Sequence, residues 1–245
     1  MPIDIQALPE KIKENPHWRV NFRPTIHKIR INEIEALDLI KETSVKLRGW
    51  PYPFLSDDRE EQILEENYIA SGFDWHRHTE YWRLYSSGQF IHLFQVREKS
   101  DKDWDKKLRE EAEDYILPFR KNVDLAIPGF IDILNLLYNF TEFFEFAARL
   151  CGKNLYQEEL EINVELLKIK GFALIAQYPK LWRGYYPATS EKITKTWTTS
   201  PEDILAKSTE LALEGAFYFL ERFGWHNPPI DILKEDQEKF LSSKI

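Results

Sequence analysis

The segment from Asp74 to Glu80 concentrates residue types that bind metal ions or transfer protons. It reads Asp74-Trp75-His76-Arg77-His78-Thr79-Glu80. If the segment is extended, alternate side chains share one face, and Asp74, His76, His78 and Glu80 line up. Two imidazoles and two carboxylates suit a divalent metal such as zinc, manganese or iron, or general acid–base catalysis. The competing interpretation is a polar strand end with solvated histidines, because the two imidazoles need a third ligand from elsewhere.

An aromatic β-hairpin directly after this segment forms a second candidate site. The pattern predicts strands over residues 79–86 and 89–97, joined at Ser87-Gly88, an acceptable turn pair. A two-residue turn places Tyr85 opposite Phe90, Arg83 opposite His92 and Tyr81 opposite Phe94. The predicted ligand-binding residues are Arg83, His92, Tyr81 and Tyr85, which suit an anion or a stacked base. Since both faces of the hairpin are largely apolar, a buried structural network is the competing interpretation.

A third candidate is the basic, aromatic segment from Tyr178 to Tyr186. Its predicted nucleic-acid contacts are Lys180, Trp182, Arg183, Tyr185 and Tyr186. Aromatic rings between Lys and Arg residues are typical of surfaces that bind single-stranded nucleic acid. Arg19 and Arg23 near the N-terminus add positive charge. The competing interpretation is an ordered loop whose rings pack inward.

The elements that position these residues follow from periodicity and capping signals. Helices are expected from Asn32 to about residue 47, from about 98 to 119, over 122–150 in one or two pieces, and from Ser200-Pro201 to Phe223, before a short tail helix. Strands are predicted over residues 18–31, 68–75, 79–86, 89–97, 160–166, 169–175 and 193–199. This order predicts an α+β protein with antiparallel sheets packed against helices.

The chain divides into an N-terminal arm, residues 1–17, and two candidate α+β lobes, residues 18–152 and 153–245, which together form either one compact domain or two similar halves. Two helices end alike, at Arg48-Gly49-Trp50-Pro51 and at Arg222-Phe223-Gly224-Trp225. A diverged duplication explains this match, and so does the general preference for Gly after a helix.

Composition restricts the classes of function. The net charge of -8 argues against a protein whose whole surface binds along nucleic acid, although a local basic patch is compatible with this net charge. The single cysteine, Cys151, excludes an intrachain disulfide and a multi-cysteine zinc site. No phosphate-binding glycine loop or nucleophile elbow occurs. One cysteine, no targeting segment and no long apolar run predict a soluble cytoplasmic protein that does not span a membrane.

Four blocks of the chain resemble a widespread, uncharacterised microbial protein family. They are Arg48 to Pro53, Glu80 to Phe94, Phe140 to Leu150, and Leu211 to Trp225. That family is associated with DNA-binding, Schlafen AlbA-type proteins. The resemblance covers residues 18 to 240 and implies a free-standing unit, but no catalytic residue, since the family has no established activity.

Three functions remain open at this point. The leading hypothesis is a non-enzymatic accessory protein without a cofactor that engages another macromolecule, as a protein partner or by self-association, because abundant aromatics suit interfaces. The second is nucleic-acid binding in regulation or antiviral defence. The third is a metal-dependent enzyme that uses Asp74, His76, His78 and Glu80 with a divalent metal.

Overall fold

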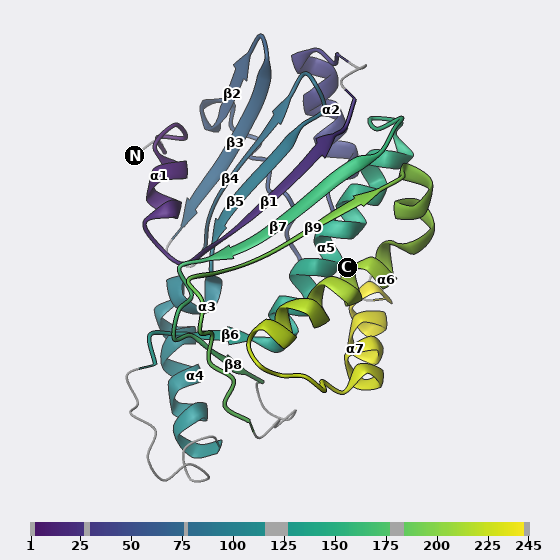
Figure 1. Cartoon of the computed structure of the whole chain (residues 1–245). Helices are drawn as coiled ribbons and strands as arrows, with labels where there is room; N and C mark the ends of the chain where they lie inside the picture. The colour runs from purple at the N-terminus through teal and green to yellow at the C-terminus, as the bar shows by residue number, and fades with distance from the viewer. Residues whose placement is uncertain (1–2, 27–29, 76–77, 116–126, 177–183, 243–245) are drawn as a thin grey trace.

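One antiparallel sheet organises the protein in the computed structural model, which describes residues 3–26, 30–75, 78–115, 127–176 and 184–242. Within these ranges the sheet has seven strands in the order β2-β3-β4-β5-β1-β7-β9 (Figure 1). Their bounds are β1 (His17–Pro24), β2 (Gln62–Glu65), β3 (Tyr68–Trp75), β4 (His78–Tyr85), β5 (Phe90–Gln95), β7 (Leu160–Leu167) and β9 (Lys192–Thr199). The predicted α+β class with an antiparallel sheet is therefore confirmed.

Helices cover the two faces of this sheet unequally. The long helices α5 (Ile133–Gly152) and α6 (Pro201–Arg222) lie on one face, with α2 (Glu33–Thr43) and α7 (Ile230–Ser242) beside them (Figure 1). The alternate residues Trp18, Val20 and Phe22 of β1 point into this layer and join the main hydrophobic core. The short helix α1 (Leu8–Lys13) covers part of the other face, where Leu8 and Ile12 are buried.

A smaller layer lies beyond one end of the sheet. It contains α3 (Arg97–Ser100), α4 (Lys102–Tyr115) and the parallel strands β6 (Phe130–Asp132) and β8 (Ala173–Ile175) (Figure 1). A single 3-10 turn, η1 (Arg59–Glu61), precedes β2. Helix α5 was expected to begin near residue 122 or after Pro128-Gly129, but the chain first forms β6. Asp132 then caps α5 by accepting the backbone N–H of Asn135 at 2.8 Å.

Local sequence signals set most boundaries where they were expected. Asn32 and Glu35 form a capping box at the start of α2. Ser200 caps α6 and Pro201 occupies its first turn. Gly49 and Gly224 both have positive φ, +86° and +88°, which ordinary residues avoid. No helix in the described ranges is long and apolar enough to cross a membrane.

The two predicted lobes contribute to the same sheet. Strand β1 pairs with β5 on one side and with β7 on the other, so residues 18–152 and 153–245 share its hydrogen bonds. Helices α5 and α6, one from each segment, meet at Gly215, where an added Cβ would lie 2.6 Å from Phe140 Cδ1. The sheet and the helical layer are thus built jointly by both segments.

The register of the aromatic hairpin differs by one residue from the prediction. Arg83 lies opposite Ile91 and Trp82 opposite His92, so Arg83 and His92 point to opposite faces. The reason is the loop: Tyr85 N–H donates to Gln89 O at 2.8 Å, which leaves three loop residues, Ser86 to Gly88. Gly88 has φ +84°, the left-handed conformation that three-residue hairpin loops require. A one-residue change of register moves the side chains of one strand to the other face relative to those of its partner strand.

Replacing Gly88 by alanine is expected to lower the free energy of unfolding by about 1–2 kcal/mol, because an L-residue is strained at positive φ. An added Cβ would meet only Leu155 and Tyr156 at ordinary distances, 3.6–3.7 Å, so steric overlap adds nothing. Urea denaturation measures the change. The control Ser87→Ala in the same loop should stay within about 0.5 kcal/mol of the wild type; equal losses in both variants would contradict the assigned cause.

Candidate functional site

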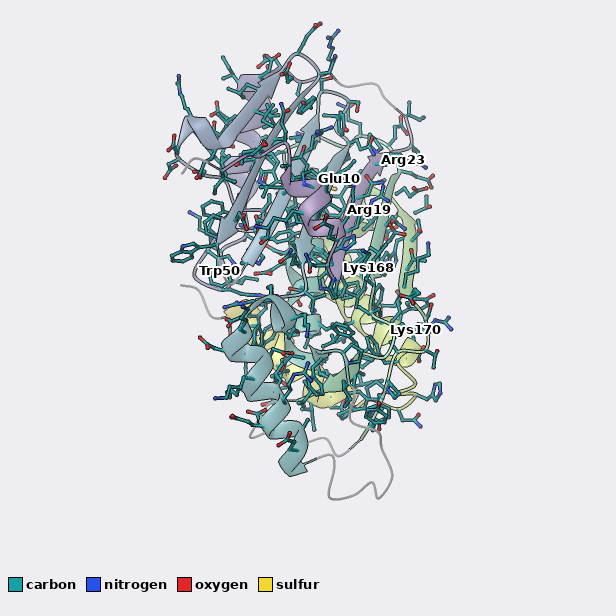
Figure 2. All side chains as sticks on the ribbon, turned by 90° about the vertical axis from the view of Figure 1, so that its left-hand side faces the viewer. Glu10, Arg19, Arg23, Trp50, Lys168 and Lys170 are labelled. Atoms are coloured by element: carbon teal, nitrogen blue, oxygen red, sulfur yellow. The ribbon has the colours of Figure 1, made fainter. Side chains whose placement is uncertain are left out.

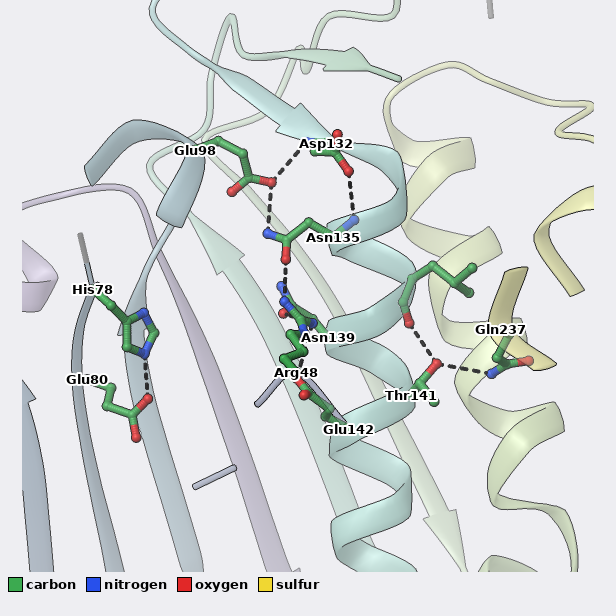
Figure 3. Close-up of polar contacts among 11 residues, drawn as sticks. Arg48, His78, Glu80, Glu98, Asp132, Asn135, Asn139, Thr141, Glu142 and Gln237 are labelled. Carbon is green, nitrogen blue, oxygen red and sulfur yellow. Dashed lines mark hydrogen bonds and ion pairs between the residues drawn. The ribbon is translucent and has the colours of Figure 1, made fainter. Parts of the chain in front are cut away.

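Charged and polar side chains gather between helix α5 and the face of the sheet that α5 and α6 cover, here called the inner face. His78 and Glu80 come from β4 and Glu142 from α5 (Figure 3). His92 of β5 lies beside them. The segment after α2 adds Arg48, Trp50 and Tyr52. Burying this many ionisable groups is costly unless they are paired or bind something, so their partners decide what the site can do.

Glu80 is the buried anchor of the site. Its Oε1 accepts the backbone N–H of Phe54 at 2.7 Å, and its Oε2 lies 2.5 Å from His78 Nε2 (Figure 3). Burial alone would raise the pKa of Glu80, but the hydrogen bond and charge of His78, with smaller effects of His92 and the Phe54 N–H, lower it overall. Because a carboxylate only accepts, His78 donates from Nε2, and in the tautomer with a single ring proton Nδ1 is an acceptor.

A second network runs along α5. Arg48 donates to Asn135 Oδ1 and, at 2.7 Å, to Asn139 Oδ1, and its Nη2 lies 3.1 Å from Glu142 Oε2 (Figure 3). Asn135 in turn donates to Glu98 Oε1 at 2.9 Å. The guanidinium of Arg48 therefore donates hydrogen bonds to two Asn side chains and supplies a positive charge beside Glu142, on an otherwise apolar helix.

The carboxyl groups of this network hold protons unusually tightly. Burial raises the pKa of Glu142 to about 7, although Arg48 opposes the shift. Burial and the neighbouring Asp132 raise the pKa of Glu98 to about 7. Burial also lowers the pKa of His92 to about 4, so that this ring is neutral at pH 7. Such opposed shifts in one place are typical of functional sites.

Several buried atoms of this region find no hydrogen-bond partner among the described residues. They are Arg48 Nε, Tyr52 Oη, His78 Nδ1, both ring nitrogens of His92, and Glu142 Oε1. All five residues line one space of about 30 Å³, here called the inner cavity. This volume holds one or two water molecules or a small ligand group. Donors and acceptors therefore converge on a space sized for a polar fragment.

A larger space, the outer cavity, adjoins it and measures about 360 Å³. Its walls are aromatic, and it shares Trp50, His78, Glu80 and Arg97 with the inner cavity; the other lining residues are Phe54, Phe73 and Trp75. Trp50 and Trp75 are 38% and 65% exposed, so this cavity opens to solvent. Figure 2 shows Trp50 at one side of the molecule, away from the basic side chains Arg19, Arg23 and Lys168. An apolar cavity of this size with polar groups at its base has the character of a ligand pocket.

Among the residues predicted as metal ligands, the structure separates Asp74 from His78 and Glu80. Strands β3 and β4 are antiparallel, with Asp74 opposite Thr79 and Phe73 opposite Glu80. Asp74 therefore lies on the α1 side, 2.5 Å from Lys11 Nζ, whereas His78 and Glu80 face the core. His76 lies outside the described residues. Within the described ranges no group of three or more His, Cys, Asp or Glu residues is placed to hold a metal. The expected shared face was wrong for Asp74, because the chain reverses direction between the two strands.

The predicted ligand-binding group of the hairpin is also divided. Arg83 donates to Tyr81 Oη at 2.8 Å and to Tyr85 Oη at 3.1 Å, and its guanidinium lies 4.1 Å from the ring centroid of Tyr68. This group lies on the α1 side of the sheet. His92 lies on the inner face beside Tyr52 and Phe94, because of the three-residue loop.

The predicted nucleic-acid residues are only partly described. Lys180, Trp182 and Arg183 lie outside the described residues. Tyr185 and Tyr186 are half-buried, and Tyr186 stacks on Trp225 with ring centroids 5.4 Å apart. Among the N-terminal basic residues, Arg19 and Arg23 each pair with a glutamate of β7, Glu165 and Glu161. These pairs reduce the positive charge available to a phosphate backbone.

Sequence reasoning missed the α5 side of the site. Asn135, Asn139 and Glu142 stand at spacings of four and three residues, which places them on one helix face. Such a polar stripe on an otherwise apolar helix indicates a buried polar network, and this was the signal that could have identified the α5 side. Nothing local linked Arg48 and Tyr52 to it, since their contact with α5 depends on the tertiary fold.

The raised pKa of Glu142 predicts a pH dependence of stability. The folded protein binds this proton more tightly than the unfolded chain, so the stabilisation is present below the ordinary value of 4.5 and is lost as pH rises to about 7. Glu142→Gln removes this contribution. Between pH 5 and pH 8 the stability of the variant should rise relative to the wild type by on the order of 1–3 kcal/mol.

Urea denaturation at both pH values measures this difference. Glu98 and His92 are present in both proteins, so their contributions to the pH dependence of stability cancel in the comparison. Glu145→Gln, which removes a partly exposed pair with Arg149 on the same helix, is the matched control and should follow the wild-type curve. A Glu142→Gln curve parallel to that of the wild type would show that Glu142 does not titrate in this range.

Comparisons with known proteins supply no further assignment: no family model, no curated protein and no solved structure matches the chain. The candidate site is therefore defined by its own geometry, a buried Glu80–His78 pair and an Arg48–Glu142 network that face two adjoining cavities.

Proposed function

We propose that the protein binds a small organic molecule in the outer cavity, with a flat apolar part between the aromatic walls and a polar end at His78 and Glu80. The observation that carries this proposal is the junction of the two cavities. Apolar rings line the outer one, and five residues with unpartnered buried polar atoms line the inner one. An apolar cavity with a few convergent polar groups is the usual composition of a ligand site.

The Glu80–His78 pair defines the chemistry available to the bound molecule. Glu80 fixes the orientation of the imidazole, and both residues line both cavities. A ligand group with an N–H or O–H donor fits this position. Burial of the pair strengthens such a hydrogen bond, because water does not compete for it.

Trp75→Ala is the direct test, because Trp75 is 65% exposed and its loss leaves the fold intact. Saturation-transfer NMR with indole, benzimidazole and 2-naphthol as probes should detect binding to the wild type. The variant should lose about tenfold or more in affinity, since one stacked ring contributes ~1–3 kcal/mol.

Ile34→Ala, which removes another exposed apolar side chain on α2, is the control and should bind the probes as the wild type does. The proposal fails if none of the three probes binds the wild type at millimolar concentration. It also fails if both variants bind them equally well.

The macromolecular hypotheses drawn from the sequence remain predictions. A protein partner, self-association or a nucleic acid is compatible with a ligand cavity, since the molecule bound at Trp75 is either free or part of a larger partner. A metal-dependent activity would need ligands beyond the described residues, and elemental analysis of the purified protein tests it.

A further inference from the structure

We infer that the outer cavity binds a nucleobase that carries an exocyclic amino group. The inference rests on the proposed function and names its ligand class. It begins from the shape of the walls. The ring centroids of Phe54 and Phe73 lie 4.8 Å apart with the planes tilted by 45°, and Trp75 meets Phe73 edge to face at 5.9 Å, so that the three rings form an angled aromatic wall. The ring of Trp50 stacks on that of His78, with centroids 6.3 Å apart, and forms a second aromatic wall. Such walls suit a flat ring.

The positive charge of Arg97 favours a neutral ring over a cationic ligand as the occupant of the outer cavity. Its guanidinium lies 4.6 Å from the ring centroid of Trp50 and lines the outer cavity. Aromatic cages for quaternary ammonium groups depend on rings and carboxylates, and a fixed positive charge within the cage opposes them. Among the described residues, the outer cavity is lined by one carboxylate, Glu80, and one guanidinium, Arg97, which carry opposite charges. A neutral, electron-rich heterocycle is therefore the favoured occupant.

The polar groups at the bottom of the outer cavity determine which hydrogen-bonding groups the edge of the ring must carry. In the singly protonated tautomer that donates Nε2–H to Glu80, His78 Nδ1 is a buried acceptor for which the described residues supply no donor, and Glu80 beside it retains further lone pairs as a carboxylate. Acceptors require donors, and the exocyclic amino groups of adenine, cytosine and guanine are such donors. Reading a base by hydrogen bonds to its edge while aromatic residues hold its faces is the usual arrangement for unstacked bases.

The same base is available from a free nucleoside or nucleotide and from an unpaired position of a single strand. Both sources share the ring chemistry, and the cavity volume of about 360 Å³ accommodates one base. They differ in the phosphates, because a strand brings several charges and a salt-dependent contribution to affinity.

The experiment compares adenosine with purine riboside, which lacks only the 6-amino group, by isothermal titration calorimetry. The wild type should bind adenosine about fivefold to tenfold more tightly, the effect of one hydrogen bond. Trp75→Ala should weaken both about tenfold or more. In His78→Ala the preference for adenosine should vanish, and continued binding of purine riboside shows that this variant is folded. Ile34→Ala should match the wild type.

Cytidine and guanosine extend the test to the other amino-bearing bases. Binding of indole with no binding of adenosine, cytidine or guanosine would overturn this inference and leave the proposed function standing. Failure of indole, benzimidazole and 2-naphthol as well would refute both. Octamers of riboadenosine and deoxyadenosine identify the source: binding at least tenfold tighter than adenosine that falls with salt indicates a strand, and equal affinities indicate a free nucleoside.

Discussion

Replacing Glu80 by alanine is expected to lower the free energy of unfolding by about 3–5 kcal/mol, the range for breaking a buried charged pair by removing one partner. The substitution leaves the Phe54 N–H and His78 Nε2 without their acceptor inside the protein. Unpaired buried donors carry their full desolvation cost. Denaturant unfolding followed by far-UV circular dichroism measures the loss.

Asp74→Ala is the matched control for this prediction. Asp74 sits in the neighbouring strand and also accepts two hydrogen bonds, from Lys11 and Thr79, but its side chain and that of Lys11 are partly exposed. An exposed pair contributes about 1 kcal/mol or less. Glu80→Gln should fall between the two, because the amide oxygen still accepts the Phe54 N–H. Equal destabilisation by Asp74→Ala and Glu80→Ala would contradict the distinct environments of these carboxylates.

Phe140→Ala is expected to cost about 3–5 kcal/mol, as for other fully buried aromatic residues. Its ring lies at the centre of the helix–sheet interface, 4.9 Å from Phe219 and 5.6 Å from Phe143, and it is completely buried. Truncation leaves a cavity that rigid neighbours do not fill. Leu205→Ala on α6 removes a side chain that is half exposed and should cost less than about 1 kcal/mol.

Gly215 provides an internal check on the same contact. A Cβ at this position would lie 2.6 Å from Phe140 Cδ1, so Gly215→Ala overpacks the wild type. In the Phe140→Ala background the added methyl enters the new cavity instead. The two changes should therefore couple by about 0.5–3 kcal/mol in the favourable direction. Additive losses would mean that the ring and the glycine do not constrain each other.

Local chemistry made much of the fold predictable. The alternation in β7 matches burial at every position, and the caps at Asn32 and Ser200 mark the starts of α2 and α6. These features depend on neighbouring residues alone. The register of the hairpin was harder to predict, because Ser-Gly suits loops of two or three residues and only the hydrogen bond between Tyr85 N–H and Gln89 O distinguishes them.

The candidate site was only partly predictable for a different reason. His78 and Glu80 were identified from their spacing, and the structure brings them together. Arg48 reaches Glu142 only because α2 and α5 pack against the same face of the sheet, a relation that no local pattern encodes. The outer cavity likewise combines Trp50, Phe54 and Trp75 from segments on both sides of β2.

The position of β1 in the sheet has a consequence for biosynthesis. This strand precedes the other six strands of the sheet in the sequence, yet it lies between β5 and β7, and β7 is synthesised only after residues 25–159. Until then the backbone groups that β1 later shares with β7 lack their partner, and they form an edge open to pairing with other chains. Closing the centre of the sheet thus depends on contacts distant in sequence, which slow folding and lengthen the exposure of the nascent protein to aggregation.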